Sequence, residues 1–157
     1  MFSVASSLNH SDAQKVIEAA VRVGRKYNTK PLAISVLDAG GHLVAYLRED
    51  GCGVLREQIA RGKAYGALGM GLSSQTIAEK LGQRTAFLGA VAAASGGRFV
   101  PVPGGVLIIK QGVAVGAVGI SGDNSPVDSA VAVQALRECG FACSPSEPAQ
   151  DWIKSKL

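Results

Sequence analysis

Two stretches in the second half of the chain combine β-branched residues with glycine, and they predict a β-hairpin that leads into a helix. Val106–Lys110 and Val113–Ser121 are rich in Val and Ile and are separated by Gln111-Gly112, which suits a two-residue turn. The second strand is apolar on both faces, so we expect it to be buried in the middle of a sheet. A helix is predicted to follow, with Ser125 as its N-cap and Pro126 in its first turn.

The first half of the chain predicts a helix followed by another hairpin. Apolar positions recur at helical spacing after Ser11, which forms a capping-box pattern with Gln14. Leu32–Leu37 and His42–Arg48 then indicate strands, and the sequence from Asp38 to Gly41 is typical of the turn between them.

Between the hairpins, the pattern predicts helices over about Leu55–Leu72, Thr76–Leu81 and Arg84–Ala94. Glycines weaken the first of these helices by about 1 kcal/mol each relative to Ala, so their presence indicates tight packing. Arg98–Pro103 is expected to be extended, because a proline pushes the preceding residue out of the α region. The last predicted helix, Pro126–Cys139, ends at a glycine.

The order of these elements indicates an α+β fold with a central antiparallel sheet flanked by helices. A chain of 157 residues suits one compact domain, which we assign to 1–157, with a core from about 11 to 140. The C-terminal tail, 144–157, carries an isolated Trp152 and is interpreted as a docking segment.

Composition narrows the class of protein. The net charge is +4, but Lys and Arg are dispersed without a dense basic block, which argues against a nucleic-acid partner. The three cysteines, Cys52, Cys139 and Cys143, cannot all pair, so a reducing compartment is expected. Neither an export signal nor an unbroken apolar run of about 18 residues is found, and we therefore expect a cytoplasmic protein without a membrane partner.

Four motifs occur in an order that resembles a known family. They are VLDAGGHLVAYLREDG at Val36–Gly51, RGKAYGAL at Arg61–Leu68, FVPVPGGVLI at Phe99–Ile108 and GVAVGAVGISGDNSPVD at Gly112–Asp128. Over about residues 11–140 the chain is similar to the GlcG/HbpS-like (DUF336) haem-binding, so-called haem-degrading, family. That family also includes the C-terminal domain of the PduO-type corrinoid adenosyltransferases.

The resemblance implies a profilin-like or roadblock-like α+β fold with a five-stranded antiparallel sheet. It also implies a homo-oligomer, from dimer to octamer, that binds haem or another tetrapyrrole. By this resemblance, the protein is expected to be an accessory binding protein without strong catalytic activity.

The loop before the second hairpin is the first candidate for the ligand pocket. Phe99, Pro101 and Pro103 are expected to form a rigid apolar wall, and Gly104 and Gly105 would let a planar ligand lie close to the backbone.

Two polar residues complete the candidate tetrapyrrole site. His42 begins a strand inside a family motif and is the candidate metal ligand, since haem iron takes His, Cys, Met or Tyr; a structural role at the turn is the alternative. Lys63 could pair with a ligand carboxylate or be a solvated cation. Arg48 and Arg98 are secondary candidates for the same role, and His10 is interpreted as a solvated residue near the N-terminus.

Two other functions remain open at this point. The first is a small-molecule enzyme of a catabolic pathway, such as a hydrolase, deaminase or isomerase, that uses Asp128, His42 or Cys52 in the same groove. The sequence lacks the common motifs of nucleophile, phosphate-binding, zinc and dinucleotide sites, so no motif supports an enzymatic function. The second is a structural assembly partner.

Overall fold

The computed structural model describes residues 1–156 and contains one antiparallel sheet. Its strands are β1 (Ala33–Asp38), β2 (Leu43–Arg48), β3 (Gly105–Lys110), β4 (Val113–Ser121) and β5 (Ala142–Ser144). Their order across the sheet is β2-β1-β4-β3-β5, so β4 lies in the middle as its apolar pattern predicts. The predicted α+β fold with five antiparallel strands is confirmed.

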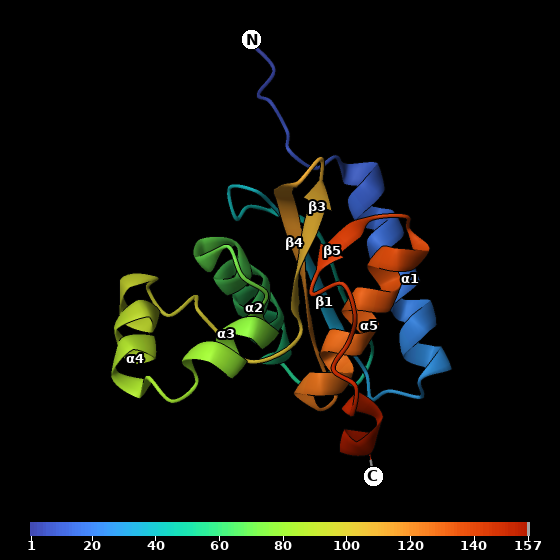
Figure 1. The fold of residues 1–157 in the computed structure, drawn as a ribbon. Coiled ribbons are helices and arrows are strands. Elements are labelled where there is room, and N and C mark those ends of the chain that lie inside the picture. Colours follow the sequence, from blue (N-terminus) through green and yellow to red (C-terminus); the bar gives the residue numbers. More distant parts are fainter. Residues whose placement is uncertain (157) are drawn as a thin grey trace.

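Helices cover both faces of this sheet (Figure 1). They are α1 (His10–Lys26), α2 (Arg56–Met70), α3 (Ser74–Leu81), α4 (Thr85–Ala94) and α5 (Ser125–Glu138). One face is covered by α1 and α5, which also pack against each other, and the other face by α2 with α3 beside it. Figure 1 shows α4 standing apart from the sheet, beyond α3.

The larger part of the core lies between the sheet and the pair α1 and α5. Its buried side chains include Val16, Ile34, Val118, Val131 and Leu136. The opposite face has a thinner core of mostly small residues, which are Leu37, Ala64, Ala67, Leu107 and Ala117.

Glycines in the central strand allow α2 to lie close to the sheet. A Cβ placed on Gly119 would overlap the backbone carbonyl of Ala60, and such contacts do not occur between real atoms. The tight packing predicted for the α2 glycines is present as well: a Cβ on Gly62 would lie 2.5 Å from the Val100 side chain. Small side chains on both surfaces therefore set the short distance between α2 and β4.

The structure corrects three local predictions. The N-cap of α1 is Asn9, whose side chain accepts from the backbone N–H of Asp12, so the capping box expected at Ser11 is wrong. The N-cap of α5 is Asn124, and Ser125 is already helical. The short edge strand β5 was not predicted, because three residues give too little alternation to detect.

The C-terminal tail docks on its own chain. It forms a short 3₁₀ helix, η1 (Trp152–Lys156), and the Trp152 ring lies 4.7 Å from the ring of Tyr27. The Lys156 ammonium group donates to the backbone carbonyl of Asn28 at 2.9 Å. The interpretation of this tail as a docking segment therefore agrees with its contacts on the end of α1.

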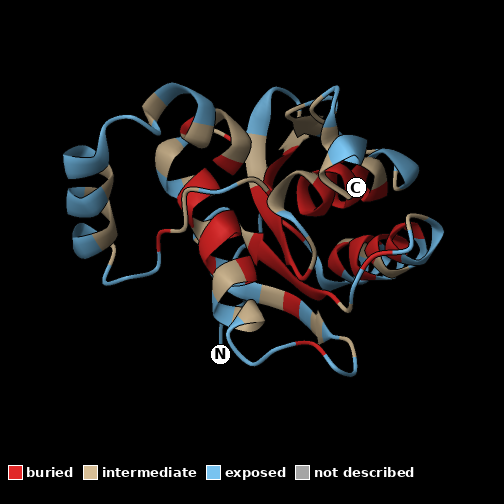
Figure 2. Cartoon of the chain, turned by 90° about the horizontal axis from the view of Figure 1, so that it is seen from below, coloured by how far each residue is buried: buried red, intermediate tan, exposed pale blue. Residues whose placement is uncertain are grey.

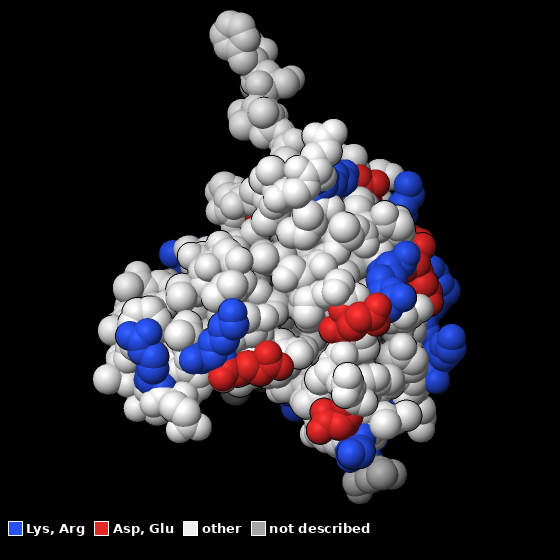
Figure 3. All heavy atoms as spheres, in the orientation of Figure 1, with Lys and Arg blue, Asp and Glu red and all other residues white. Residues whose placement is uncertain are grey.

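Charged side chains are interspersed on the face shown in Figure 3, where no dense basic block is visible. No helix within residues 1–156 is long and apolar enough to cross a membrane.

Candidate functional site

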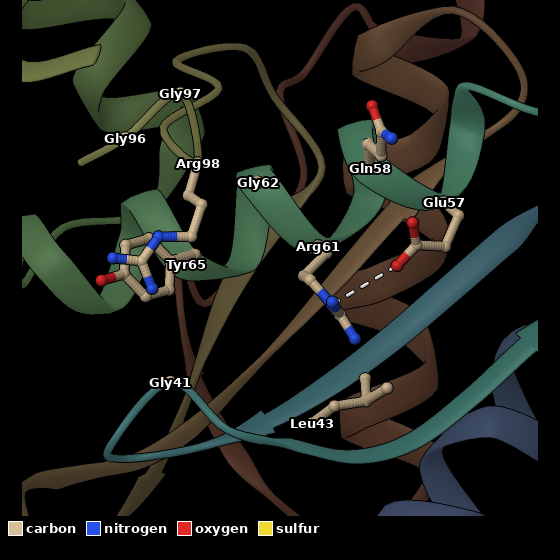
Figure 4. Close-up of a pocket in the computed structure, with 10 residues that line it drawn as sticks. All are labelled: Gly41, Leu43, Glu57, Gln58, Arg61, Gly62, Tyr65, Gly96, Gly97 and Arg98. Carbon is tan, nitrogen blue, oxygen red and sulfur yellow. Dashed lines mark ion pairs between the residues drawn. The ribbon is translucent and has the colours of Figure 1, made fainter. Parts of the chain in front are cut away.

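A pocket of about 380 Å³ opens beside α2, on the side that faces the turn between β1 and β2. Figure 4 shows Arg61 pointing from α2 towards Leu43, while Tyr65 and Arg98 lie together on the side of Gly41. Arg61 and Tyr65 come from α2, Arg98 from the segment after α4 and Leu43 from β2. A pocket of this volume lies within the usual range for small-molecule sites.

The regular spacing of α2 divides its residues between the core and this pocket. Lys63, Ala64 and Ala67 are buried against the sheet, whereas Arg61 and Tyr65, which are four residues apart, share the outer face. The same helix thus contributes to the core with one face and to the pocket with the other.

Arg98 and Tyr65 form a stacked pair in the pocket (Figure 4). The guanidinium carbon of Arg98 lies 4.3 Å from the centre of the Tyr65 ring, and its Nε donates to the Ser95 carbonyl at 2.9 Å. Gly96 and Gly97, with φ of 65° and 80°, turn the chain between α4 and Arg98. The left-handed backbone required there favours glycine and leaves the pocket wall free of side chains.

Arg61 is oriented by an acidic neighbour on the same helix. Its Nε lies 3.4 Å from Glu57 Oε1, and both side chains are partly exposed. The two residues are four apart, which is the usual spacing for an ion pair on a helix surface.

His42 is not among the residues that line the pocket, but its two neighbours in the chain, Gly41 and Leu43, are. The His42 side chain is 80% exposed, and its Nδ1 lies 3.2 Å from Asp38 Oδ1. Burial acts to raise the pKa of Asp38, but hydrogen bonds from the backbone and ring of His42 and from the Gly40 backbone hold it below its usual value. Asp38 therefore stays ionised and orients the imidazole.

Lys63 does not line the pocket, because its side chain is buried at the end of β4, next to the start of α5, with 1% exposed. Its ammonium group donates to Asp128 Oδ2 and to the Ile120 carbonyl, each at 2.9 Å. Asp128 is fully buried and also accepts from the backbone N–H of Asp123 at 2.9 Å. The carboxylate partner expected for Lys63 is thus supplied by the chain itself.

Burial disfavours the charged forms of Lys63 and Asp128, and the charge of each residue favours the charged form of the other. Desolvation lowers the pKa of Lys63, while the charge and hydrogen bond of Asp128 act to raise it. Desolvation likewise raises the pKa of Asp128, against the charge and hydrogen bond of Lys63. The pair therefore links α2 to the start of α5 across the end of β4.

The slot expected beside Gly104 and Gly105 is filled within this chain. A Cβ on Gly104 would lie 2.9 Å from both Cδ and Nζ of Lys63, and one on Gly105 would overlap the Lys63 carbonyl. Ser74 closes the same segment by accepting from the Gly105 N–H at 2.7 Å. These glycines are needed for close packing against α2, which corrects the interpretation of an open slot.

The rest of this loop is divided between core and surface. Phe99 is 6% exposed and packs against Gly66, while Pro101 and Pro103 are half-buried. Phe99 also contributes to a smaller groove between α2 and α4. Direct contact of these residues with a ligand stays a prediction.

The candidate groups for acid–base or nucleophilic chemistry lie in different surroundings. Asp128 is buried and paired with Lys63, His42 is exposed beside Asp38, and Cys52 is 9% exposed, with burial raising the pKa of its thiol. Within residues 1–156, no hydrogen bond or ion pair joins any two of these three side chains. In the same part of the chain, no cluster of three or more His, Cys, Asp or Glu side chains is arranged to hold a metal ion.

The sequence analysis ranked Arg98 only as a secondary site candidate. It did not predict that Arg61, Tyr65 and the glycines of the pocket wall line the site. The signal was in the Arg61–Leu68 motif, where Arg61 and Tyr65 alternate with small residues that face the sheet. Helical spacing alone would have separated Arg61 and Tyr65 from Lys63.

This fold defines a small α+β protein with a pocket between the outer face of a central helix and a hairpin turn. Residues 8–137 match the family model described as "Haem degrading protein HbpS-like", and the chain belongs to that HbpS-like family. No curated protein sequence matches significantly.

Solved structures share this fold at low sequence identity. A PduOC:heme complex is 23% identical, with a TM-score of 0.77, covering 87% of this chain and 97% of that one. The ORFY protein of Klebsiella pneumoniae is 24% identical, with a TM-score of 0.77 and coverage of 88% and 93%. A double mutant of HbpS from Streptomyces reticuli is 23% identical, with a TM-score of 0.72 and coverage of 88% and 90%.

Proposed function

We propose that this protein binds haem or a closely related tetrapyrrole in the pocket between α2 and the β1–β2 turn. The observation that carries the proposal is the set of groups lining the pocket, where the Tyr65 ring and two guanidinium groups, Arg61 and Arg98, face glycine backbone and Leu43. A flat, largely apolar ring with acidic substituents needs such a combination of apolar surface and cations. Membership of the HbpS-like family and the fold shared with a haem complex support the same ligand class.

His42 is the residue that we assign to the iron. Its Nδ1 faces the Asp38 carboxylate, which favours the tautomer with a proton on Nδ1 and a free electron pair on Nε2. Histidines that bind metals usually have such a carboxylate or carbonyl partner on the second nitrogen. The donor set thus fits haem, whose iron takes a histidine as an axial ligand.

A haemin titration followed by absorbance tests this function. The wild-type protein is expected to shift the Soret band at micromolar haemin, and His42→Ala should lose this shift and weaken binding about tenfold or more. His10→Ala is the matched control, because His10, the other of the two histidines, lies on α1 across the sheet. An unchanged Soret band in the wild type contradicts the proposal, and equal effects of both substitutions contradict the role of His42.

We infer an accessory role for this binding, without catalysis by Asp128, His42 or Cys52. The separation of these groups supports this view, since general acid–base work needs two of them within hydrogen-bond reach of one reacting group.

We also propose that the protein self-associates through α4. None of the ten residues of this helix, all described by the structure, is buried, and none is charged. Figure 2 shows α4 with exposed and intermediate residues only, apart from the body. A helix shorter than about 12 residues is marginal without packing, and an apolar helix surface is normally covered.

The charges of α4 favour pairing with the α4 helix of a second copy of the chain in antiparallel orientation. In α4 there is no acidic residue in the first turn and no basic residue in the last, and the cation Arg84 occupies the N-cap, where the helix dipole disfavours it. Antiparallel pairing would place each Arg84 beside the partner's negative helix end. The exposed Ala86, Gly89, Ala90 and Ala93 share the outer face and permit close approach.

A further inference from the structure

Arg98 differs from the other cation of the pocket because its guanidinium is already fixed in place. Its Nε is held by the Ser95 carbonyl, and one face of the group lies on the Tyr65 ring (Figure 4). Within residues 1–156, no acceptor is bonded to its two terminal nitrogens. A guanidinium held in this way presents the terminal nitrogens as a fork that matches the two oxygens of a carboxylate.

Arg61 is less suited to the same task. Glu57 lies 3.4 Å from its Nε and already supplies a negative charge, so a ligand carboxylate near Arg61 would be repelled by Glu57. This difference makes Arg98 the stronger anion-binding group of the two.

The wall beside Arg98 leaves room for a ligand. A Cβ placed on Gly96 or on Gly97 would meet no atom within 4 Å, so the backbone there borders open space. Both glycines line the same pocket as Arg98. A carboxylate at the edge of a flat ligand could therefore reach the Arg98 fork without displacing a side chain.

We propose that Arg98 binds a carboxylate of the ligand, so that the pocket selects tetrapyrroles whose edge carries free carboxylates over the corresponding esters. This inference rests on the proposed function and adds the chemical class that the pocket recognises. Holding Arg98 by Nε and by stacking reduces the side-chain freedom that is lost on binding, so the fork is preorganised.

The test compares haemin with haemin dimethyl ester, which have the same ring and iron and differ in their carboxylates. The wild-type protein is expected to bind haemin about tenfold more tightly than the diester, as a charge-assisted hydrogen-bonded pair would provide. Arg98→Gln should weaken haemin binding about tenfold and leave the affinity for the diester unchanged. Arg98→Lys, which keeps the charge but loses the fork, is expected to fall between them.

Lys110→Gln is the matched control. Lys110 is also a cation over an aromatic ring, with its Nζ 5.1 Å from the centre of Phe141, but it does not line the pocket. This substitution should change neither affinity.

The outcomes separate this inference from the function on which it rests. Equal affinities of the wild type for haemin and its diester, or an equal loss of both ligands in Arg98→Gln, overturn the role of Arg98 while haem binding stands. Failure of the wild type to bind either ligand overturns the proposed function and this inference together.

Discussion

Replacing Lys63 by Met tests whether the buried pair with Asp128 links α2 to the start of α5 across the end of β4. Met keeps an unbranched apolar stem and deletes the ammonium group, so the substitution removes two hydrogen bonds of 2.9 Å, to Asp128 and to the Ile120 carbonyl. Asp128 then stays in the core with its bond from the Asp123 N–H. Breaking a buried pair on one side costs about 3–5 kcal/mol, because the remaining charge is uncompensated.

The assay is urea unfolding followed by far-UV circular dichroism at pH 7. We expect the free energy of unfolding of Lys63→Met to fall by about 3–5 kcal/mol with little change in the denaturant slope. The double variant Lys63→Met/Asp128→Leu should recover much of this loss, since an apolar pair of similar size often replaces a buried ion pair at little cost.

The cost of Lys63→Met should also depend on pH. Without Lys63, only the hydrogen bond from the Asp123 N–H and the charge of Arg56 still oppose the desolvation that raises the pKa of Asp128, so this pKa rises further above its ordinary value of 3.8. In the pH window between 3.8 and the raised folded-state pKa, the folded variant binds more protons than the unfolded chain, and its stability falls as pH rises. The difference from the wild type should therefore be smaller at pH 5 than at pH 7.

Lys110→Met is the matched control, because its ammonium group lies 3.0 Å from Asp12 but both side chains are partly exposed. An exposed pair contributes about 1 kcal/mol or less. The reasoning is refuted if Lys63→Met costs no more than Lys110→Met, or if its cost is the same at both pH values.

Two further predictions concern packing and assembly. Gly119→Ala should cost more than about 2 kcal/mol or prevent folding, because its Cβ would overlap the Ala60 carbonyl. Gly69→Ala on α2, with no atom near its Cβ, should instead stabilise the protein by about 0.5–1 kcal/mol. Thermal unfolding of both variants measures these effects, and a tolerated Gly119→Ala would contradict the packing. Ala90→Glu on the outer face of α4 should dissociate the oligomer, as measured by sedimentation velocity. Val113→Glu, at an exposed position of β4, is the control and should leave the oligomer intact. A wild type that sediments as a monomer would exclude self-association through α4.

The order of helices and strands could be predicted because each element has a local signal. The apolar pattern of β4 predicted a buried strand in the middle of the sheet, and β4 does lie between β1 and β3. The N-cap of α1 was misplaced because Asn9 and Ser11 both begin plausible capping patterns, and the hydrogen bond that decides between them is seen only in the structure.

The site was harder to predict, because it depends on contacts between distant parts of the chain. Lys63 and Asp128 are 65 positions apart, and nothing local in the sequence shows that they meet. Lys63 was interpreted as a partner for a ligand carboxylate or as a solvated cation, and neither interpretation anticipated a buried pair within the chain. Arg98 acquires its role only when the turn at Gly96 and Gly97 places it over Tyr65.

The packing of α2 explains why the pocket lies beside β2. The inner face of α2 carries small residues, so the helix lies close to the middle of the sheet and packs on β4, β1 and β3. The edge strand β2 is left without a helix above its α2-facing side, and the outer residues Arg61 and Tyr65 extend over the space that results. A larger residue on the inner face would lift the helix and move Arg61 and Tyr65 with it. Substitutions in the core of this protein are therefore expected to alter ligand binding as well as stability.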